Sequence, residues 1–207
     1  IGVALNYLEK FDEAEIYLRK AIKLKPDLPD SYSNLSKTLQ VLGRLNEAKE
    51  CLIKAIELKP DYSDAIFNLS LIQMFQDDYI SGLKNYESRF KMKKDVKLYF
   101  QPELSRWYGE SPKKGEKLLI ISEQGLGDTI HFMRYIPCLK EKGYKVKFCA
   151  QEQLNPIIKE SGIESNLITS QQANQILDGK YCPLLSLPLY LGVNQNNPIV
   201  SEPYIST

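Results

Sequence analysis

The chain has 207 residues, which is enough for one large domain or two modest ones. Its 27 Lys and Arg residues balance 26 Asp and Glu residues, so the net charge of +1 offers no basic field for binding nucleic acid or anionic lipid. The longest apolar stretches, at residues 118–121 and 184–189, are far shorter than the roughly 20 residues that a membrane-spanning helix needs, and no membrane span is expected.

Four cysteines are spread along the chain, at Cys51, Cys138, Cys149 and Cys182. They have no CxxC spacing and the chain holds a single histidine, so the sequence predicts no metal site. Isolated thiols of this kind indicate reduced core residues, and we expect a cytoplasmic protein. The chain does not begin with Met, and we expect the natural protein to extend further.

The first half contains an internal repeat. Residues 20–30 (KAIKLKPDLPD) and 54–64 (KAIELKPDYSD) are identical at eight of eleven positions and lie 34 residues apart, which is the period of the tetratricopeptide repeat (TPR), a helix-turn-helix unit. In the complete copy, residues 29–62, the positions expected to pack between the helices hold small residues or leucines: Leu35, Ser36, Leu39, Ala48, Leu52 and Ala55. We therefore predict a helical TPR array over residues 1–96 with a truncated first repeat.

The third copy, residues 63–96, departs from this pattern. Gly82 and Arg89 stand at two of the small-residue positions, and Lys94 replaces the expected proline. The helical spacing of Tyr79, Leu83, Tyr86 and Phe90 still predicts a helix. A degenerate last repeat is typical of the end of a stack.

Two asparagines, Asn34 and Asn68, occupy the same position in consecutive repeats, on the first helix of each. An amide both donates and accepts, so asparagines at one-repeat intervals could hold the backbone of an extended peptide. The array resembles the TPR superhelix of protein O-GlcNAc transferases, and this resemblance implies such a ladder inside a groove that binds a protein or peptide partner. The alternative is that both amides simply face water.

Residues 97–116 lose the helical period and contain Pro102, Gly109, Pro112 and Gly115, which predicts a linker between domains. Trp107, the only tryptophan, is expected to anchor the junction by packing rather than to stack on a ligand.

Residues 117–207 alternate between strand-like and helix-like segments. KLLIIS, YKVKFCA and NLIT read as short strands, with helical patterns between and after them and a last strand-turn-helix unit in YCPLLSLPLYLG. This alternation predicts a Rossmann-like α/β domain with a parallel sheet.

The turn after the first predicted strand, EQGLGD, carries the candidate substrate-binding residues Glu123, Gln124, Gly125 and Gly127. It lies at the carboxyl end of a strand, where doubly wound sheets bind ligands. The third glycine of a dinucleotide fingerprint is missing because Ile130 stands there, so NAD or FAD binding is retained only as a further alternative.

The segment GDTIHFMRYIPCL resembles the first strand-to-helix turn of the bacterial heptosyltransferases. Together with SRWYG and CPLLSLPL it resembles bacterial TPR proteins that carry a heptosyltransferase-like domain. This resemblance implies the acceptor-side half of a two-domain (GT-B) glycosyltransferase that uses a nucleotide sugar as donor, with no metal or other cofactor. The donor-binding half is not contained in residues 117–207, so we expect this chain alone to be inactive.

In the scheme that the resemblance implies, Asp128 is the general base that deprotonates the acceptor hydroxyl during inverting transfer. His131, one turn further, contacts the acceptor or orients Asp128. The competing interpretations are that Asp128 is the N-cap of its helix and that His131 is merely hydrogen-bonded. As a competing function, the repeats form a protein-interaction scaffold beside a catalytically silent α/β domain.

Overall fold

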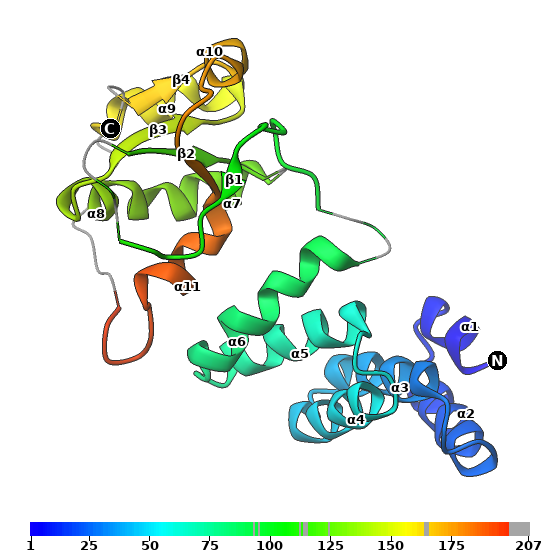
Figure 1. Ribbon diagram of the computed structural model, residues 1–207. Helices are drawn as coiled ribbons and strands as arrows, with labels where there is room; N and C mark the ends of the chain where they lie inside the picture. The colour runs from blue at the N-terminus through cyan, green and yellow to red at the C-terminus, as the bar shows by residue number, and fades with distance from the viewer. Residues whose placement is uncertain are drawn as a thin grey trace. The chain divides into compact units, whose positions relative to one another are not determined.

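The computed structural model describes residues 1–92, 94, 96–111, 113, 116–123, 125–163 and 166–198. The chain forms two compact units, Ile1–Asp95 and Val96–Thr207. The first unit is helical and the second combines strands and helices (Figure 1). Within the described ranges, none of the helices is both long enough and apolar enough to cross a membrane.

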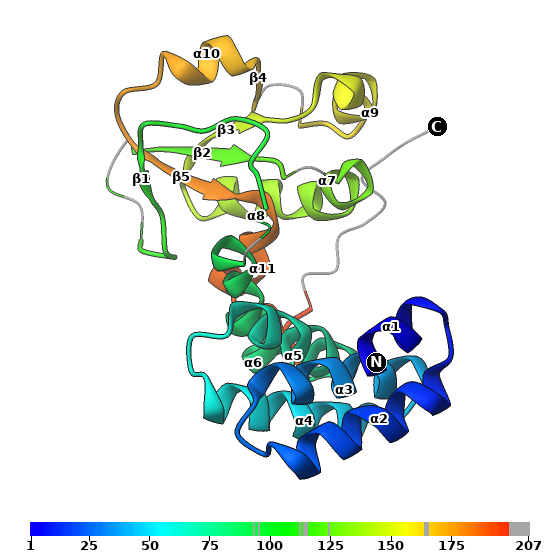
Figure 2. The same cartoon turned by 90° about the vertical axis from the view of Figure 1, so that its right-hand side faces the viewer.

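The first unit is built from consecutive helices that pack in antiparallel pairs, as predicted. They are α1 (Gly2–Tyr7), α2 (Phe11–Leu24), α3 (Pro29–Val41), α4 (Leu45–Leu58), α5 (Ser63–Phe75) and α6 (Tyr79–Tyr86), followed by the 3₁₀ helix η1 (Glu87–Lys91). In Figure 2, α1, α3 and α5 form a layer above α2 and α4. The predicted array of TPR-like helix pairs is thus confirmed.

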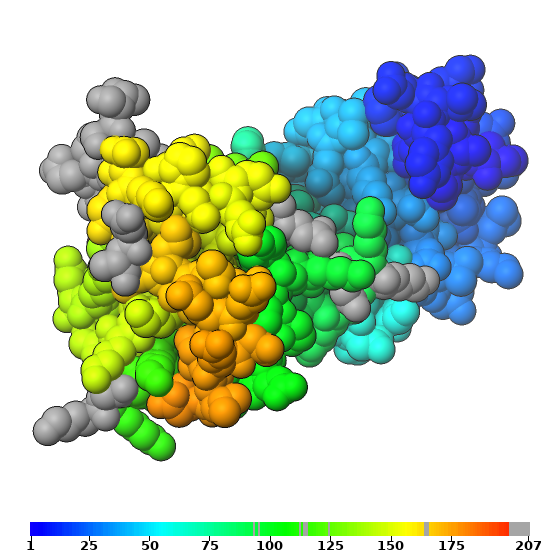
Figure 3. Space-filling model, turned by 90° about the horizontal axis from the view of Figure 1, so that it is seen from above, coloured from blue at the N-terminus to red at the C-terminus, as the bar shows by residue number. Residues whose placement is uncertain are grey.

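The predicted packing positions form the core of this unit. Leu39, Ala48, Leu52 and Ala55 are fully buried, and they belong to one hydrophobic cluster that runs from Ala14 to Ile72 through all the repeats. The space-filling view shows the successive repeats in direct contact, from dark to light blue (Figure 3). The small residues are therefore required because the helices approach closely.

The third repeat changes shape where its sequence departs from the pattern. Arg89 stands where the other repeats have alanine, yet it is only 1% exposed. Its guanidinium lies over the rings of Tyr86 and Phe90, at 4.4 and 4.1 Å from their centroids, and Nη1 donates to Oε1 of Glu87 at 2.7 Å. A guanidinium does not fit an alanine-sized gap, which accounts for the change from α6 to the 3₁₀ helix η1 at this point.

A four-residue ion-pair network joins the first two repeats. Arg44 contacts Glu15 of α2 at 2.7 Å and Glu47 of α4 at 2.6 Å, and Arg19 contacts the same two carboxylates at 2.7 and 3.0 Å. Burial acts to raise the pKa of Glu15, but the hydrogen bonds from Arg19 and Arg44 outweigh it and hold that pKa below its usual value.

This network predicts an acid sensitivity of the helical unit. A carboxyl group with a lowered pKa in the folded state stabilises the fold above its unfolded pKa, and that contribution is lost as the pH falls through the folded value. We expect the urea midpoint, followed by far-ultraviolet circular dichroism, to fall below about pH 4.3, and Glu15→Gln to flatten this dependence. Glu50→Gln, on the exposed side of α4, is the matched control. An unchanged pH dependence in Glu15→Gln would refute the assignment.

The second unit contains a five-stranded sheet in the order β1-β5-β2-β3-β4, in which every pair is parallel. The strands are β1 (Ser105–Arg106), β2 (Lys117–Ile121), β3 (Lys145–Cys149), β4 (Leu167–Ile168) and β5 (Lys180–Pro183). The helices are α7 (Leu126–Phe132), α8 (Ile136–Glu141), α9 (Asn155–Glu160), α10 (Ser170–Asn174) and α11 (Leu187–Leu191), with 3₁₀ turns η2 (Met133–Tyr135), η3 (Glu152–Leu154) and η5 (Leu184–Ser186). The parallel sheet that the sequence predicts is confirmed.

Helices cover both faces of the sheet. Leu119 and Ile121 of β2 pack in a cluster with Ala173 of α10, so the alternating residues Leu118 and Ile120 point to the opposite face. Figure 2 shows α10 on one side of the sheet and α8 on the other. Both faces of β2 are buried, which explains its continuous apolar run.

The segment expected to be a linker, residues 97–116, supplies β1 to the sheet of the second unit. Trp107 follows β1 and is only 3% exposed. Its backbone N–H donates to the carbonyl of Tyr181 at 2.8 Å, and its ring meets the edges of Tyr144 and Tyr190. These contacts place Trp107 in the core of the α/β unit itself. Of the predicted linker residues, Pro112 and Gly115 lie outside the described part.

Candidate functional site

Each first helix of a repeat presents one exposed stripe of side chains. On α3 the stripe is Asp30, Asn34, Lys37 and Val41, and on α5 it is Asp64, Asn68, Leu71 and Phe75. These residues are spaced i, i+4, i+7 and i+11, so they lie on one side of their helix. All are exposed or partly exposed, while the other side of each helix packs into the core. The two asparagines thus occupy equivalent places on neighbouring helices.

Hydrogen bonds hold the neighbouring helices in register. The Thr38 hydroxyl on α3 donates to Oδ1 of Asn6 on α1 at 2.9 Å. The Tyr62 hydroxyl, at the start of α5, donates to Oδ1 of Asp30 at 2.6 Å. The stripes of α3 and α5, together with Val3 and Tyr7 of α1, form what we call the three-helix face.

The two predicted peptide-binding residues are available on this face. Asn34 and Asn68 are partly exposed, and no hydrogen bond engages either side-chain amide among the residues that the structure describes. Asn34 also lines an open hollow of about 430 Å³ with Asp30 and Ser31 of α3, and residues of α1 and α2, Lys20 among them, line its other sides. The structure therefore leaves the donors and acceptors of both amides open to a ligand.

The three-helix face also carries an apolar row that our sequence reasoning missed. Tyr7, Val41 and Phe75 are each the last residue of their helix and are 86%, 61% and 75% exposed. They are spaced at the same 34-residue interval as the asparagines. The interval alone could not reveal this row, because buried packing positions such as Ala14 and Ala48 recur at the same interval; the exposure of the three side chains distinguishes them.

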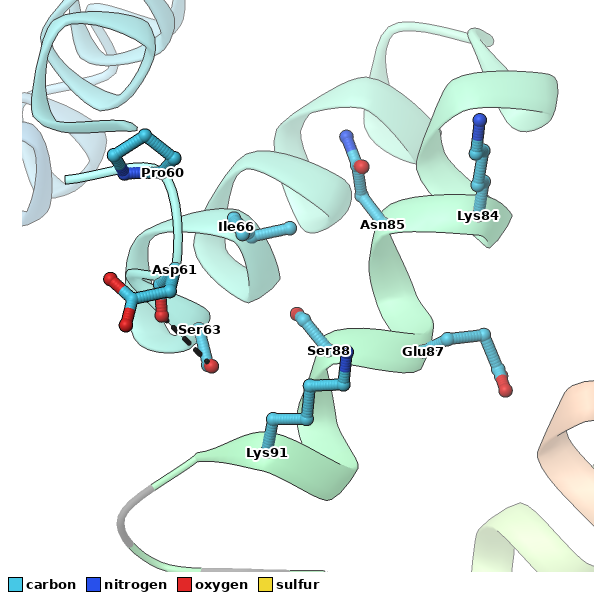
Figure 4. A pocket seen from close by; sticks show the side chains of 9 residues that line it. All are labelled: Pro60, Asp61, Ser63, Ile66, Lys84, Asn85, Glu87, Ser88 and Lys91. Atoms are coloured by element: carbon cyan, nitrogen blue, oxygen red, sulfur yellow. Dashed lines mark hydrogen bonds between the residues drawn. The ribbon is translucent and has the colours of Figure 1, made fainter. Parts of the chain in front are cut away.

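A second hollow, of about 640 Å³, lies in the third repeat (Figure 4). Residues from the α4–α5 turn and α5 line one side, and residues from α6 and η1 line the other. Lys84 and Lys91 line it together with Asp61 and Glu87, and Glu87 is already paired with Arg89. The hollow therefore mixes charges of both signs, and we assign no ligand to it.

In the α/β unit, the predicted catalytic residues follow the carboxyl end of β2. Gly125 is the N-cap of α7, and Asp128 lies exposed in the first turn of that helix. The N-cap interpretation of Asp128 is therefore wrong, because the helix begins at Leu126, two residues before Asp128. The carboxylate of Asp128 is free of that structural role.

The two glycines of the turn meet different surroundings. A Cβ added to Gly125 would collide with Oδ2 of Asp128, so the absence of a side chain there lets the carboxylate fold back over the backbone. A Cβ added to Gly127 would point into open space. Gly125 is thus required for the position of Asp128, whereas within the described residues Gly127 has no comparable steric role.

Polar contacts beside this turn link the segments that follow β2 and β3. The Gln151 amide donates to the carbonyl of Glu123, and the Thr129 hydroxyl lies 3.0 Å from both Oε1 of Gln151 and the carbonyl of Gly125. Glu123, one of the predicted substrate-binding residues, is buried, with only 3% of it exposed. Gln124, the other predicted sugar-binding residue, lies outside the described residues. Gln151, which the sequence did not single out, links the segments that follow β2 and β3.

His131 is exposed one turn beyond Asp128, and its ring stands edge-on to Phe132. Partial burial lowers its pKa and the charge of Arg134 lowers it further, while Asp128 acts in the opposite direction. The imidazole is therefore neutral at pH 7 and can donate at one nitrogen and accept at the other. Among the described residues, no cluster of His, Cys, Asp or Glu side chains is arranged to hold a metal ion.

Solved structures similar to this chain are helical repeat proteins. The TPR2B domain of yeast Sti1 in its pHsp70 complex is 26% identical, with 44% of this chain and 73% of that chain covered and a TM-score of 0.42. The first TPR of Spaghetti (RPAP3) bound to the HSP90 peptide SRMEEVD is 20% identical over the same shares, also with a TM-score of 0.42. The Sgt2 TPR domain from Aspergillus fumigatus is 25% identical, covers 42% of this chain and 58% of that chain, and has a TM-score of 0.40.

No curated protein matches the chain significantly. The tetratricopeptide repeat family matches residues 1–28 and 29–62, the two copies that the sequence period defined. The third copy, with Arg89 in place of alanine, falls outside these matches. The first unit of the chain is therefore a TPR-type helical array with matched repeats over residues 1–62.

Proposed function

We propose that the three-helix face binds an extended peptide of a partner protein, and that Asn34 and Asn68 hold the peptide backbone. The observation that carries this proposal is the pair of unengaged amides at the same position of α3 and α5. Side-chain bonds such as Tyr62–Asp30 link α3 and α5, so their axes lie at least the roughly 8–10 Å of directly packed helices apart, which corresponds to about three residues of an extended chain or more. Each amide can therefore contact a separate peptide unit without reading side chains.

The proposal is tested by removing both amides. A peptide ligand is first selected from a displayed random library against the whole chain, and its affinity is then measured by calorimetry. We expect Asn34→Ala combined with Asn68→Ala to weaken binding by about 10- to 100-fold, because each lost hydrogen bond is worth about 1 kcal/mol. Asn174→Ala, at an exposed position of α10, is the matched control and keeps the affinity of the wild type. Equal affinity in the double variant would refute the proposal.

For the α/β unit we propose a second function, as the acceptor-side half of an inverting, metal-independent glycosyltransferase that uses a nucleotide sugar. The supporting observation is the place of Asp128. The chain adds β3 and β4 on one side of β2 and β5 on the other, so the strand order reverses at β2. Open α/β sheets bind ligands at the carboxyl ends of the strands where this reversal occurs.

In this proposal each side chain at the carboxyl end of the sheet has a separate role. The exposed carboxylate of Asp128 accepts the proton of an acceptor hydroxyl as its oxygen attacks the anomeric carbon, and the nucleoside diphosphate leaves from the opposite side. Hydrogen bonds of Thr129 and Gln151 hold the turn between β2 and α7 in place, and neutral His131 offers a hydrogen bond to the acceptor. Because the donor half lies elsewhere in this scheme, the 207-residue chain alone neither transfers sugar nor binds a nucleotide sugar tightly.

A further inference from the structure

The three-helix face is arranged in rows that run across its helices. The apolar row consists of Tyr7, Val41 and Phe75, and Val3 and Leu71, both 41% exposed, lie one turn before its ends. The amide row consists of Asn34 and Asn68, and on its far side lies an acidic row of Asp30 and Asp64. A ligand held by the amides therefore meets apolar side chains of the protein on one side and acidic side chains on the other.

The apolar row amounts to more than ordinary surface exposure. Single exposed apolar residues are normal, but side chains that recur at one position of successive helices form a contiguous strip, and such strips mark interaction surfaces. Covering these side chains removes apolar area from water at about 25 cal/mol per Å². This flank therefore favours apolar side chains of a ligand.

The acidic row favours the opposite chemistry. Asp30 and Asp64 lie in the first turns of α3 and α5, where a negative charge also stabilises the helix. Tyr62 engages one oxygen of Asp30 at 2.6 Å, which leaves the other oxygen to accept further bonds. Lys37, between the amide and apolar rows of α3, is the one cation among the residues of the face, and Lys20 of α2 lines the hollow beside Asp30. The flank beyond the amides carries the two negative charges of Asp30 and Asp64, with Lys20 near the first of them.

The distances between the rows suit one extended chain. With a rise of 1.5 Å per residue, the acidic row lies about 6 Å from the amide row, and the apolar row lies about 10 Å from it on the other side. Successive side chains of an extended peptide point in opposite directions. We infer that the ligand of the three-helix face is an extended segment in which apolar and basic side chains alternate, and this inference rests on the peptide-binding function proposed above. Two helix spacings from α1 to α5 therefore correspond to at least about six peptide residues.

The test uses three synthetic hexapeptides, blocked at both ends, with the sequences (Leu-Lys)₃, (Leu-Glu)₃ and (Ser-Lys)₃. Their binding to the whole chain is measured by calorimetry at low and moderate salt. We expect (Leu-Lys)₃ to bind about tenfold more tightly than either of the other peptides, because each of them loses one of the two flanks. Equal or tighter binding of (Leu-Glu)₃ overturns the basic part of the inference, and equal binding of (Ser-Lys)₃ overturns the apolar part.

Two variants locate the binding on the face. Asp64→Asn is expected to reduce the preference for (Leu-Lys)₃ over (Leu-Glu)₃, and Phe75→Ser to weaken both leucine peptides about equally. Circular dichroism checks that each variant keeps its helices. Preferences that stay unchanged in both variants place the binding elsewhere and overturn the inference.

Failure of this inference and failure of the proposed function give different results. If library-selected peptides depend on Asn34 and Asn68 but are acidic or lack the alternation, the inference is wrong and the peptide-binding function stands. If (Leu-Lys)₃ binds with its expected preference but equally well to the Asn34→Ala, Asn68→Ala double variant, the role proposed for the amides is wrong.

Discussion

Replacement of Asp128 by asparagine is expected to lower the turnover of the full-length protein by roughly two to four orders of magnitude, the scale of a lost general base. An amide has nearly the same shape as the carboxylate, so the exposed side chain can still fold back over Gly125. It cannot accept a proton from the acceptor hydroxyl. Transfer is followed as release of the nucleoside diphosphate, with melting of the protein measured in parallel.

Asp178→Asn is the matched control for this prediction. Asp178 pairs with Lys117 at 2.7 Å, and Lys117 begins β2, so the same change of charge is made at the other end of the strand. We expect this variant to keep the wild-type turnover. Unchanged turnover in Asp128→Asn rules this residue out as the base. A full-length protein that transfers no sugar supports the competing view, in which the α/β unit is catalytically silent.

Replacement of Leu39 by alanine is expected to destabilise the helical array by about 2–5 kcal/mol, through lost burial and the cavity left behind. Leu39 is fully buried, and its cluster joins all the repeats, so neighbouring helices cannot easily collapse into the space. Far-ultraviolet circular dichroism during urea unfolding measures the change.

The control for the leucine variant is Ile16→Ala on α2. Ile16 is 66% exposed, so we expect a change within about 0.5 kcal/mol. A loss below about 1 kcal/mol in Leu39→Ala would contradict the continuous core. It would mean that each repeat packs alone rather than against its neighbours.

The helical array was predictable because its packing is repeated. Small residues such as Ala48 and Ala55 are needed wherever two helices approach closely, and the stack imposes that need again after 34 residues. The strand β2 was predictable for another reason. It is buried on both faces and therefore reads as an unbroken apolar run.

Other features could not be found because they depend on contacts far apart in the sequence. Strand β1 has two residues, too few to show an alternating pattern, and it is defined only by its pairing with β5. The helical pattern in residues 129–143 is divided at Met133–Tyr135, and Pro137, the second residue of α8, lacks a backbone donor.

The candidate sites were predictable only in part. The asparagines could be placed by their interval, but the burial of Glu123 and its backbone contact with Gln151, which follows β3, depend on the fold. The apolar row of Tyr7, Val41 and Phe75 becomes meaningful only when their exposure is known. Helix boundaries decide the role of Asp128, since a start at Leu126 moves it from the cap into the first turn.

The central claim is that Asn34 and Asn68 contact a peptide together. The most direct measurement is heteronuclear NMR of the side-chain amide groups in the whole chain, titrated with a library-selected peptide. We predict that the side-chain signals of Asn34 and Asn68 shift with one common dissociation constant, while that of Asn174 stays in place. Shifts confined to α2, α4 or the α/β unit, with both of these signals unmoved at saturation, would contradict the account.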